Sequence, residues 1–174
     1  MKKHCSNHTY NYLLKAFLLD HMDSMNISVT LCFNAAVEPI DGAYVVKKWH
    51  DKMAKTALGS HYKRYQREDK VVGLYFPEVC PSTAFTTGSG NNGFLHYHGK
   101  LRISKNFNLI EEVAEEVWEA YALKAINNQR SNARPTIEFG DDSSGRKWSN
   151  YCTKNMKYDK VTLTPLLQDH FVLL

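Results

Sequence analysis

The segment from residue 93 to residue 103 alternates in side-chain character, and this pattern is typical of a β-strand with one buried face. His96 and His98 would lie on one face of that strand, and Leu101 and Ile103 would continue the opposite, buried face. Two neutral imidazoles on one face can hold one metal ion. The same pair also occurs on ordinary strands that bind nothing, so other residues must decide between the two interpretations.

The segment 148–158 carries a second set of reactive side chains. It contains no Gly or Pro, and Ser143 and Ser144 precede it as N-cap candidates, so we expect a short helix. Tyr151 and Lys154 are three residues apart and would project from neighbouring points on one helical face. A tyrosine hydroxyl can attack a phosphodiester when a metal polarises the phosphate and a cation offsets the developing charge. Considered alone, Tyr151 is better explained as a packing residue.

At these residues the chain resembles the HUH endonucleases and, within that superfamily, the Rep-type initiators of rolling-circle replication. His96 and His98 match the family's two-histidine metal motif, and Tyr151 with Lys154 matches its single-tyrosine motif, Y-x-x-K. The stretch Val29–Asn34 is a looser counterpart of the first motif, an apolar strand that ends in an F-T-x-N-like sequence. The three motifs occur in the family's order and cover about residues 28–158.

The resemblance implies a mechanism. A divalent ion, Mn²⁺ or Mg²⁺, would polarise the scissile phosphate of single-stranded DNA at a replication origin or hairpin. Tyr151 would attack that phosphate, which forms a 5'-phosphotyrosine link and frees a 3'-hydroxyl, and Lys154 would orient or neutralise the phosphate or the adduct. A later 3'-hydroxyl could attack the ester and rejoin the strand, so the chain would initiate rolling-circle replication of a virus, phage or plasmid.

The third metal ligand is expected to be Glu78. In related proteins this ligand comes from the strand before the histidine strand, and the apolar run Val71–Val79 occupies that place. Pro77 cannot donate a ladder hydrogen bond, so Glu78 must sit at a strand end, an edge or a bulge. A solvated loop glutamate is the alternative, and Glu38 is the fallback ligand. An imidazole and carboxylate set accepts Mn²⁺ and Mg²⁺, and zinc or cobalt in the test tube.

Length and composition fit one compact domain. The chain has 174 residues, 43% of them hydrophobic, and a net charge of +4 that favours a polyanionic partner without requiring one. We expect residues 1–174 to form a single HUH endonuclease domain, extended by an N-terminal helix and by an apolar tail after Lys160 that packs on the domain or binds a partner. No Walker A sequence is present, so we expect no helicase domain, and a separate helicase and polymerase would be required.

The expected fold is α+β, with an antiparallel sheet of about five strands and flanking helices, similar to the ferredoxin- or RRM-like core of the HUH family. The expected strands are Ser28–Asn34, His61–Tyr65, Val71–Phe76, Phe94–Ile103 and Thr136–Phe139. Besides the Tyr151 helix, the expected helices are Tyr10–His21, Ala43–Ala57 and Leu109–Asn127. The buried edge of the last is predicted to carry Ile110, Val113, Val117, Tyr121 and Leu123 or Lys124.

Charge is unevenly distributed along the chain. A basic region interleaved with aromatic residues predicts a groove in which cations contact phosphates and rings stack on unpaired bases, although a solvated helix face followed by an edge strand fits equally well. The acidic run Glu111–Glu119 predicts a helix face directed away from DNA. The basic region contains Lys47, Lys48, Lys52, Lys55, Lys63, Arg64, Arg67 and Lys70, with Trp49, His61, Tyr62 and Tyr65 between them.

The cysteine pattern favours a reducing compartment. The four cysteines are scattered without a C-x-x-C pair, which indicates neither a zinc knuckle nor a disulfide framework. The apolar run Leu13–Leu19 is interrupted by Lys15 and is too short for a membrane span or a convincing signal peptide. We therefore expect an intracellular protein, in the cytoplasm or in the host cell if it is viral, with no membrane partner.

Two other functions stay open. One is an HUH single-strand transposase, although those enzymes typically carry glutamine where this chain has Lys154. The other is a noncatalytic RRM-like nucleic-acid-binding domain, in which His96, His98 and Tyr151 only contact nucleic acid. Tyr158, two helical turns after Tyr151, is a conceivable second nucleophile. A structural or substrate-contact role is favoured for it because two-tyrosine relatives usually place the pair closer.

Overall fold

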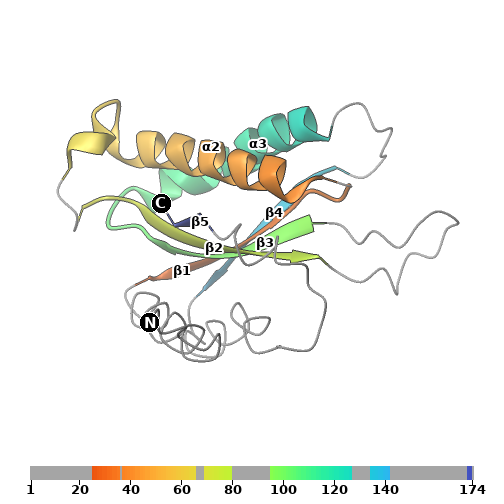
Figure 1. The fold of residues 1–174 in the computed structure, drawn as a ribbon. Coiled ribbons are helices and arrows are strands. Elements are labelled where there is room, and N and C mark those ends of the chain that lie inside the picture. The colour runs from red at the N-terminus through yellow and green to blue at the C-terminus, as the bar shows by residue number, and fades with distance from the viewer. Residues whose placement is uncertain are drawn as a thin grey trace, which may run out of the picture.

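The computed structural model describes residues 25–35, 37–65, 69–79, 95–126, 134–141 and 172–173 (Figure 1). Their elements are β1 (Ile27–Cys32), α2 (Pro39–Leu58), a 3₁₀ helix η1 (Tyr62–Arg64), β2 (Val72–Val79), β3 (Leu95–Arg102), α3 (Phe107–Ala125), β4 (Thr136–Asp141) and β5 (Val172–Leu173). The predicted α+β class is confirmed. The predicted helices around Tyr10–His21 and Tyr151 lie outside the described residues.

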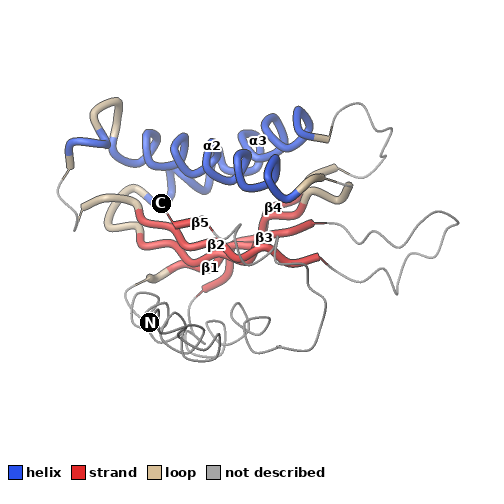
Figure 2. Tube along the Cα trace, viewed as in Figure 1, coloured by secondary structure: helices blue, strands red, loops and turns tan. Residues whose placement is uncertain are grey.

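The strands form one antiparallel sheet in the order β4-β1-β3-β2-β5. Four of them have six or eight residues, whereas β5 contributes two residues that pair with Leu74 and Tyr75 of β2. At least this part of the apolar C-terminal tail therefore packs on the domain. Figure 2 shows α2 and α3 together on one side of the sheet, so the two faces of the sheet have different surroundings.

The face of the sheet that meets the helices is apolar. Leu31 of β1 and Tyr97 of β3 are fully buried there, in agreement with the predicted alternation. Two tryptophans connect the elements: Trp49 Nε1 donates to Ala114 O (3.2 Å) and joins α2 to α3, and Trp118 Nε1 donates to the main-chain oxygen of Cys32 (3.1 Å) and joins α3 to β1. Because each buried indole N–H has an acceptor, both rings fill the core without leaving a polar atom unsatisfied.

The predicted strand His61–Tyr65 is wrong, because this segment forms the 3₁₀ turn η1. Helix α2 ends at Gly59, whose φ of 81° lies in the left-handed region that glycine tolerates. The chain then folds back on the helix, and the Tyr62 hydroxyl donates to Asp51 Oδ1 (3.0 Å). Tyr62 thus contacts α2 locally instead of extending a strand.

The buried stripe of α3 also differs from the prediction. Its buried residues are Ile110, Ala114, Trp118 and Ala122, four residues apart, and only the first was predicted. Val113, Val117 and Tyr121 are partly buried at the flanks, and Leu123 is 49% exposed. Alanine was overlooked because it is weakly hydrophobic, yet its small side chain lets α2 approach closely enough for Trp49 to bond to the α3 backbone.

A neutral polar pair lies in the core between α2 and β2. His50 is 3% exposed, and its Nδ1 is 2.8 Å from the Tyr75 hydroxyl. Burial lowers the pKa of His50 to about 4 and raises the pKa of Tyr75, so both stay uncharged at neutral pH. The Tyr75 ring also packs over Gly99, where a Cβ would lie 2.6 Å from Tyr75 Cδ1 and 2.9 Å from Val29 Cγ1.

The His50 pair makes stability depend on pH. As pH falls from about 6.5 to about 4, the unfolded chain protonates this imidazole while the folded chain does not, so stability is lost on acidification. We expect this residue to remove up to about 3 kcal/mol of the free energy of unfolding between pH 7 and pH 4. Urea unfolding of wild type and His50→Gln over this range measures the difference. Identical pH profiles would contradict the expectation.

Candidate metal centre

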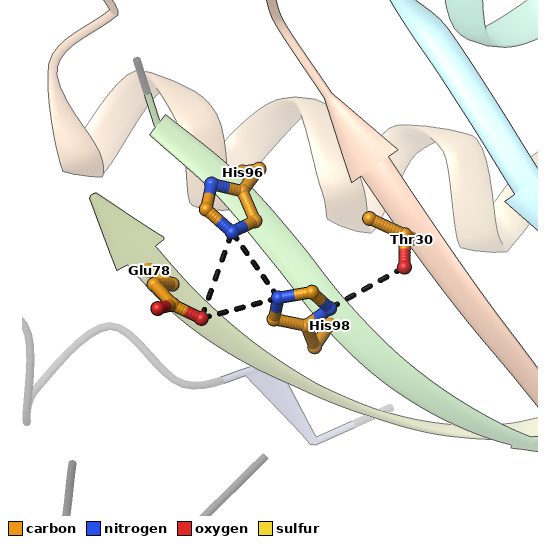
Figure 3. A network of polar contacts seen from close by, with 4 residues as sticks. All are labelled: Thr30, Glu78, His96 and His98. Atoms are coloured by element: carbon orange, nitrogen blue, oxygen red, sulfur yellow. Dashed lines mark hydrogen bonds and ion pairs between the residues drawn. The ribbon is translucent and has the colours of Figure 1, made fainter. Parts of the chain in front are cut away.

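The face of the sheet opposite the helices carries the predicted ligands. Antiparallel pairing places Glu78 of β2 beside His96 of β3, and Thr30 of β1 beside His98. Because side chains alternate along each strand, these four residues share one face. Figure 3 shows them converging in front of the sheet, with a helix behind it.

Three ligand atoms form a small triangle. His96 Nε2 and His98 Nε2 are 3.1 Å apart, and Glu78 Oε2 lies 3.1 Å from His98 Nε2 and 3.6 Å from His96 Nε2. The side chains are mostly enclosed, with 16% of His96, 9% of His98 and 17% of Glu78 exposed. The group is therefore largely enclosed, and each of the three side chains keeps a small exposed fraction.

The triangle has the dimensions of a metal-binding set. Ligand atoms about 2.1 Å from one ion lie about 3.0 Å apart at right angles and about 3.4 Å apart at tetrahedral angles. Two of the observed separations, both 3.1 Å, lie within this range, and the third, 3.6 Å between Glu78 and His96, is slightly longer. Two imidazoles and a carboxylate suit Mn²⁺ and also zinc, iron or cobalt, so the residues fit a divalent ion without selecting one.

The position of Glu78 follows from the local sequence. Strand β2 continues three residues past its predicted end at Phe76, through Pro77 to Val79. Beyond Tyr75 the outer edge of β2 pairs with no other described strand, and an edge tolerates a proline that cannot donate to the ladder. The fallback ligand Glu38 is exposed at the N-cap of α2 and does not belong to the ligand group.

Thr30 was not predicted as a site residue. Its hydroxyl lies 3.3 Å from His98 Nδ1. When Nδ1 is protonated, it donates a hydrogen bond to the Thr30 hydroxyl. The lone pair of Nε2 is then free to bind a metal, and the ring is held in place. The only sequence signal was a threonine that alternates with the apolar residues of its strand, which by itself indicates nothing about a histidine 68 residues away.

Tyr151, Lys154 and Tyr158 lie outside the described residues, so their positions relative to the triangle are not part of this structure. The four lysines of α2 in the basic region are exposed on the helix layer, on the other side of the sheet from Glu78. Trp49 is a core residue. The part of the basic region that lies on α2 is therefore not next to the metal triangle.

Comparison of the chain with protein-family models, curated proteins and solved structures finds no match in any of the three. None of the described helices is both long enough and apolar enough to cross a lipid bilayer. The function is therefore inferred from the geometry of the triangle.

The Thr30 contact gives a prediction about metal affinity. Removing the hydroxyl with Thr30→Val should weaken Mn²⁺ binding by about 10- to 100-fold, because His98 loses the bond that orients its ring. Thr30→Ser keeps the hydroxyl and should bind nearly as wild type does. The Mn²⁺ affinity of all three proteins is measured from the rise in melting temperature with Mn²⁺ concentration. Equal affinity in Thr30→Val and wild type would show that the contact does not support the metal site.

Proposed function

We propose that the chain is an HUH-type endonuclease that nicks and rejoins single-stranded DNA. The observation that carries the proposal is the convergence of Glu78, His96 and His98 within one small triangle. Such a set holds a divalent ion with positions left for a phosphate oxygen, which is what metal-assisted phosphodiester cleavage requires. The histidine spacing and the tyrosine motif of the sequence point to the same chemistry.

The order of elements supports the proposal. Strands β1 to β4 and helices α2 and α3 follow a βαββαβ pattern with the strand order 4-1-3-2. We propose that this is the ferredoxin- or RRM-like core of the HUH family. The histidines then lie on a central strand and on the face of the sheet opposite α2 and α3. Fold alone does not establish an activity, so the ligand set remains the main argument.

The roles of the residues follow from this assignment. When bound, Mn²⁺ or Mg²⁺ would supply Lewis-acid polarisation of the scissile phosphate. Tyr151 attacks the phosphorus, the bond to the 3'-oxygen breaks, and the leaving oxygen takes up a proton as a 3'-hydroxyl. Lys154 offsets negative charge on the phosphate and the adduct. Attack on the phosphotyrosine ester by another 3'-hydroxyl reverses these steps and joins the strand.

The proposed biological role is the initiation of rolling-circle replication of a virus, phage or plasmid inside the cell. Unwinding and synthesis would come from a separate helicase and polymerase. A single-strand transposase would use the same chemistry, and the preferred DNA separates the two: an origin sequence for an initiator, transposon-end hairpins for a transposase.

A covalent adduct tests the proposal. The protein is incubated with a pool of single-stranded oligonucleotides and Mn²⁺ and resolved by denaturing electrophoresis. We expect a protein–DNA band that disappears with chelator, in Tyr151→Phe and in His98→Ala, but persists in the matched control Tyr158→Phe. An adduct that survives in Tyr151→Phe would show that Tyr151 is not the nucleophile. Tight, metal-independent binding without any adduct would favour the noncatalytic nucleic-acid-binding domain.

A further inference from the structure

The outer surface of α2 and α3 combines exposed apolar residues with charges sorted by helix. The four large apolar side chains exposed among the described residues all lie on these helices, Ile40 and Tyr44 on α2 and Leu109 and Leu123 on α3. The exposed charges from the middle of α2 to its C-terminal end are lysines, whereas the first half of α3 exposes glutamates. The lysines are Lys47, Lys48, Lys52 and Lys55, and the glutamates are Glu111, Glu112, Glu115 and Glu116.

Two hydrogen bonds fix how the helices lie beside each other. Trp49 Nε1 donates to Ala114 O, which joins the middle of α2 to the middle of α3. Asn106 Nδ2 donates to Ala57 O (2.8 Å), which joins the end of α2 to the start of α3. The helices are therefore antiparallel, as Figure 1 also shows.

Residues at the same level along the two helix axes are found by counting the same number of residues outward from these bonds. This level is called the height of a residue. Ile40 at the start of α2 is level with Leu123 near the end of α3. Lys48 is level with Glu115 by the same count. Ile40, Tyr44 and Leu123 thus lie toward one end of the surface. Toward the other end a basic helix lies beside an acidic helix, with Leu109 exposed there as well.

We infer that this surface is the interface of a symmetric dimer of the chain. A two-fold axis parallel to the helices and just above them lays α2 of each copy over α3 of the other and keeps every residue at its height. Ile40 and Tyr44 of one copy then meet Leu123 of the second copy. The lysines of α2 meet the glutamates of the second copy's α3, and both contacts occur twice.

Size and charge favour a second copy over other occupants. Two helices of about 30 Å, packed about 10 Å apart, present a face of roughly 600 Å², near the roughly 800 Å² per partner of a standard interface. A nucleic acid would suit the lysines of α2 but would be repelled by the neighbouring glutamates of α3 and would leave Ile40 and Leu123 uncovered. Only a partner with the same sorted charges satisfies both helices.

The dimer is independent of the proposed nuclease activity. The metal triangle lies on the opposite face of the sheet, so the interface covers it in neither copy and both triangles are directed away from the interface. Each dimer then presents two such sites on opposite sides.

A charge exchange tests the dimer. Sedimentation equilibrium between about 1 and about 100 µM compares wild type with Lys48→Glu/Lys52→Glu and with Glu112→Lys/Glu116→Lys. We expect a wild-type dimer and a dissociation constant at least about tenfold higher in each variant, because like charges then face each other. Mixing the two variants should restore a dimer, since each reversed helix meets its complement. Lys63→Glu/Arg64→Glu, in η1, is the matched control and should dimerise normally.

Far-UV circular dichroism confirms that each variant is folded, and recovery on mixing cannot arise from misfolding. A monomeric wild type at about 100 µM would overturn the dimer. The dimer would also be overturned if both charge-reversed variants dimerised as wild type does, or if the two variants stayed monomeric when mixed. If the α2 variant lost affinity for single-stranded DNA while its dimer was unchanged, the surface would be a nucleic-acid contact.

Discussion

The antiparallel register of β3 against β1 and β2 is the constraint on which the rest of the structure depends. It places Glu78 opposite His96 and Thr30 opposite His98, so a ligand from one strand and a positioning hydroxyl from another meet the histidine pair. Side chains alternate with a period of two, and a slip of one residue would turn a whole strand over. The site therefore exists only in this register.

The apolar face of the same strands holds that register. Tyr97 and Leu101 face the helices, and a slip would bury His98 in their place at the cost of an unsatisfied polar group. Gly99 adds a steric requirement, because only a residue without a side chain accepts the Tyr75 ring there. Core packing on one face thus determines the arrangement of ligands on the other.

Sequence patterns predicted those features that depend on short spacing. The histidine strand, the place of Glu78 after Pro77 and most elements were recognisable because strand alternation and proline geometry act locally. Thr30 was missed because its contact with His98 joins residues far apart in the chain. The alanines in the buried stripe of α3 were missed because close packing against α2 matters there more than hydrophobicity. The turn at His61–Tyr65 was missed because contact with α2 overrides strand propensity. The roles of Tyr151 and Lys154 remain predictions from their motif.

The central claim is that Glu78, His96 and His98 hold one divalent ion. Isothermal titration of Mn²⁺ into wild type and Glu78→Gln tests it directly, with Glu138→Gln as the control, since that exposed carboxylate lies on β4 beside Thr30. We predict one ion per chain for wild type and for the control, and binding at least about tenfold weaker in Glu78→Gln. No binding by wild type, or equal binding by Glu78→Gln, would contradict the claim.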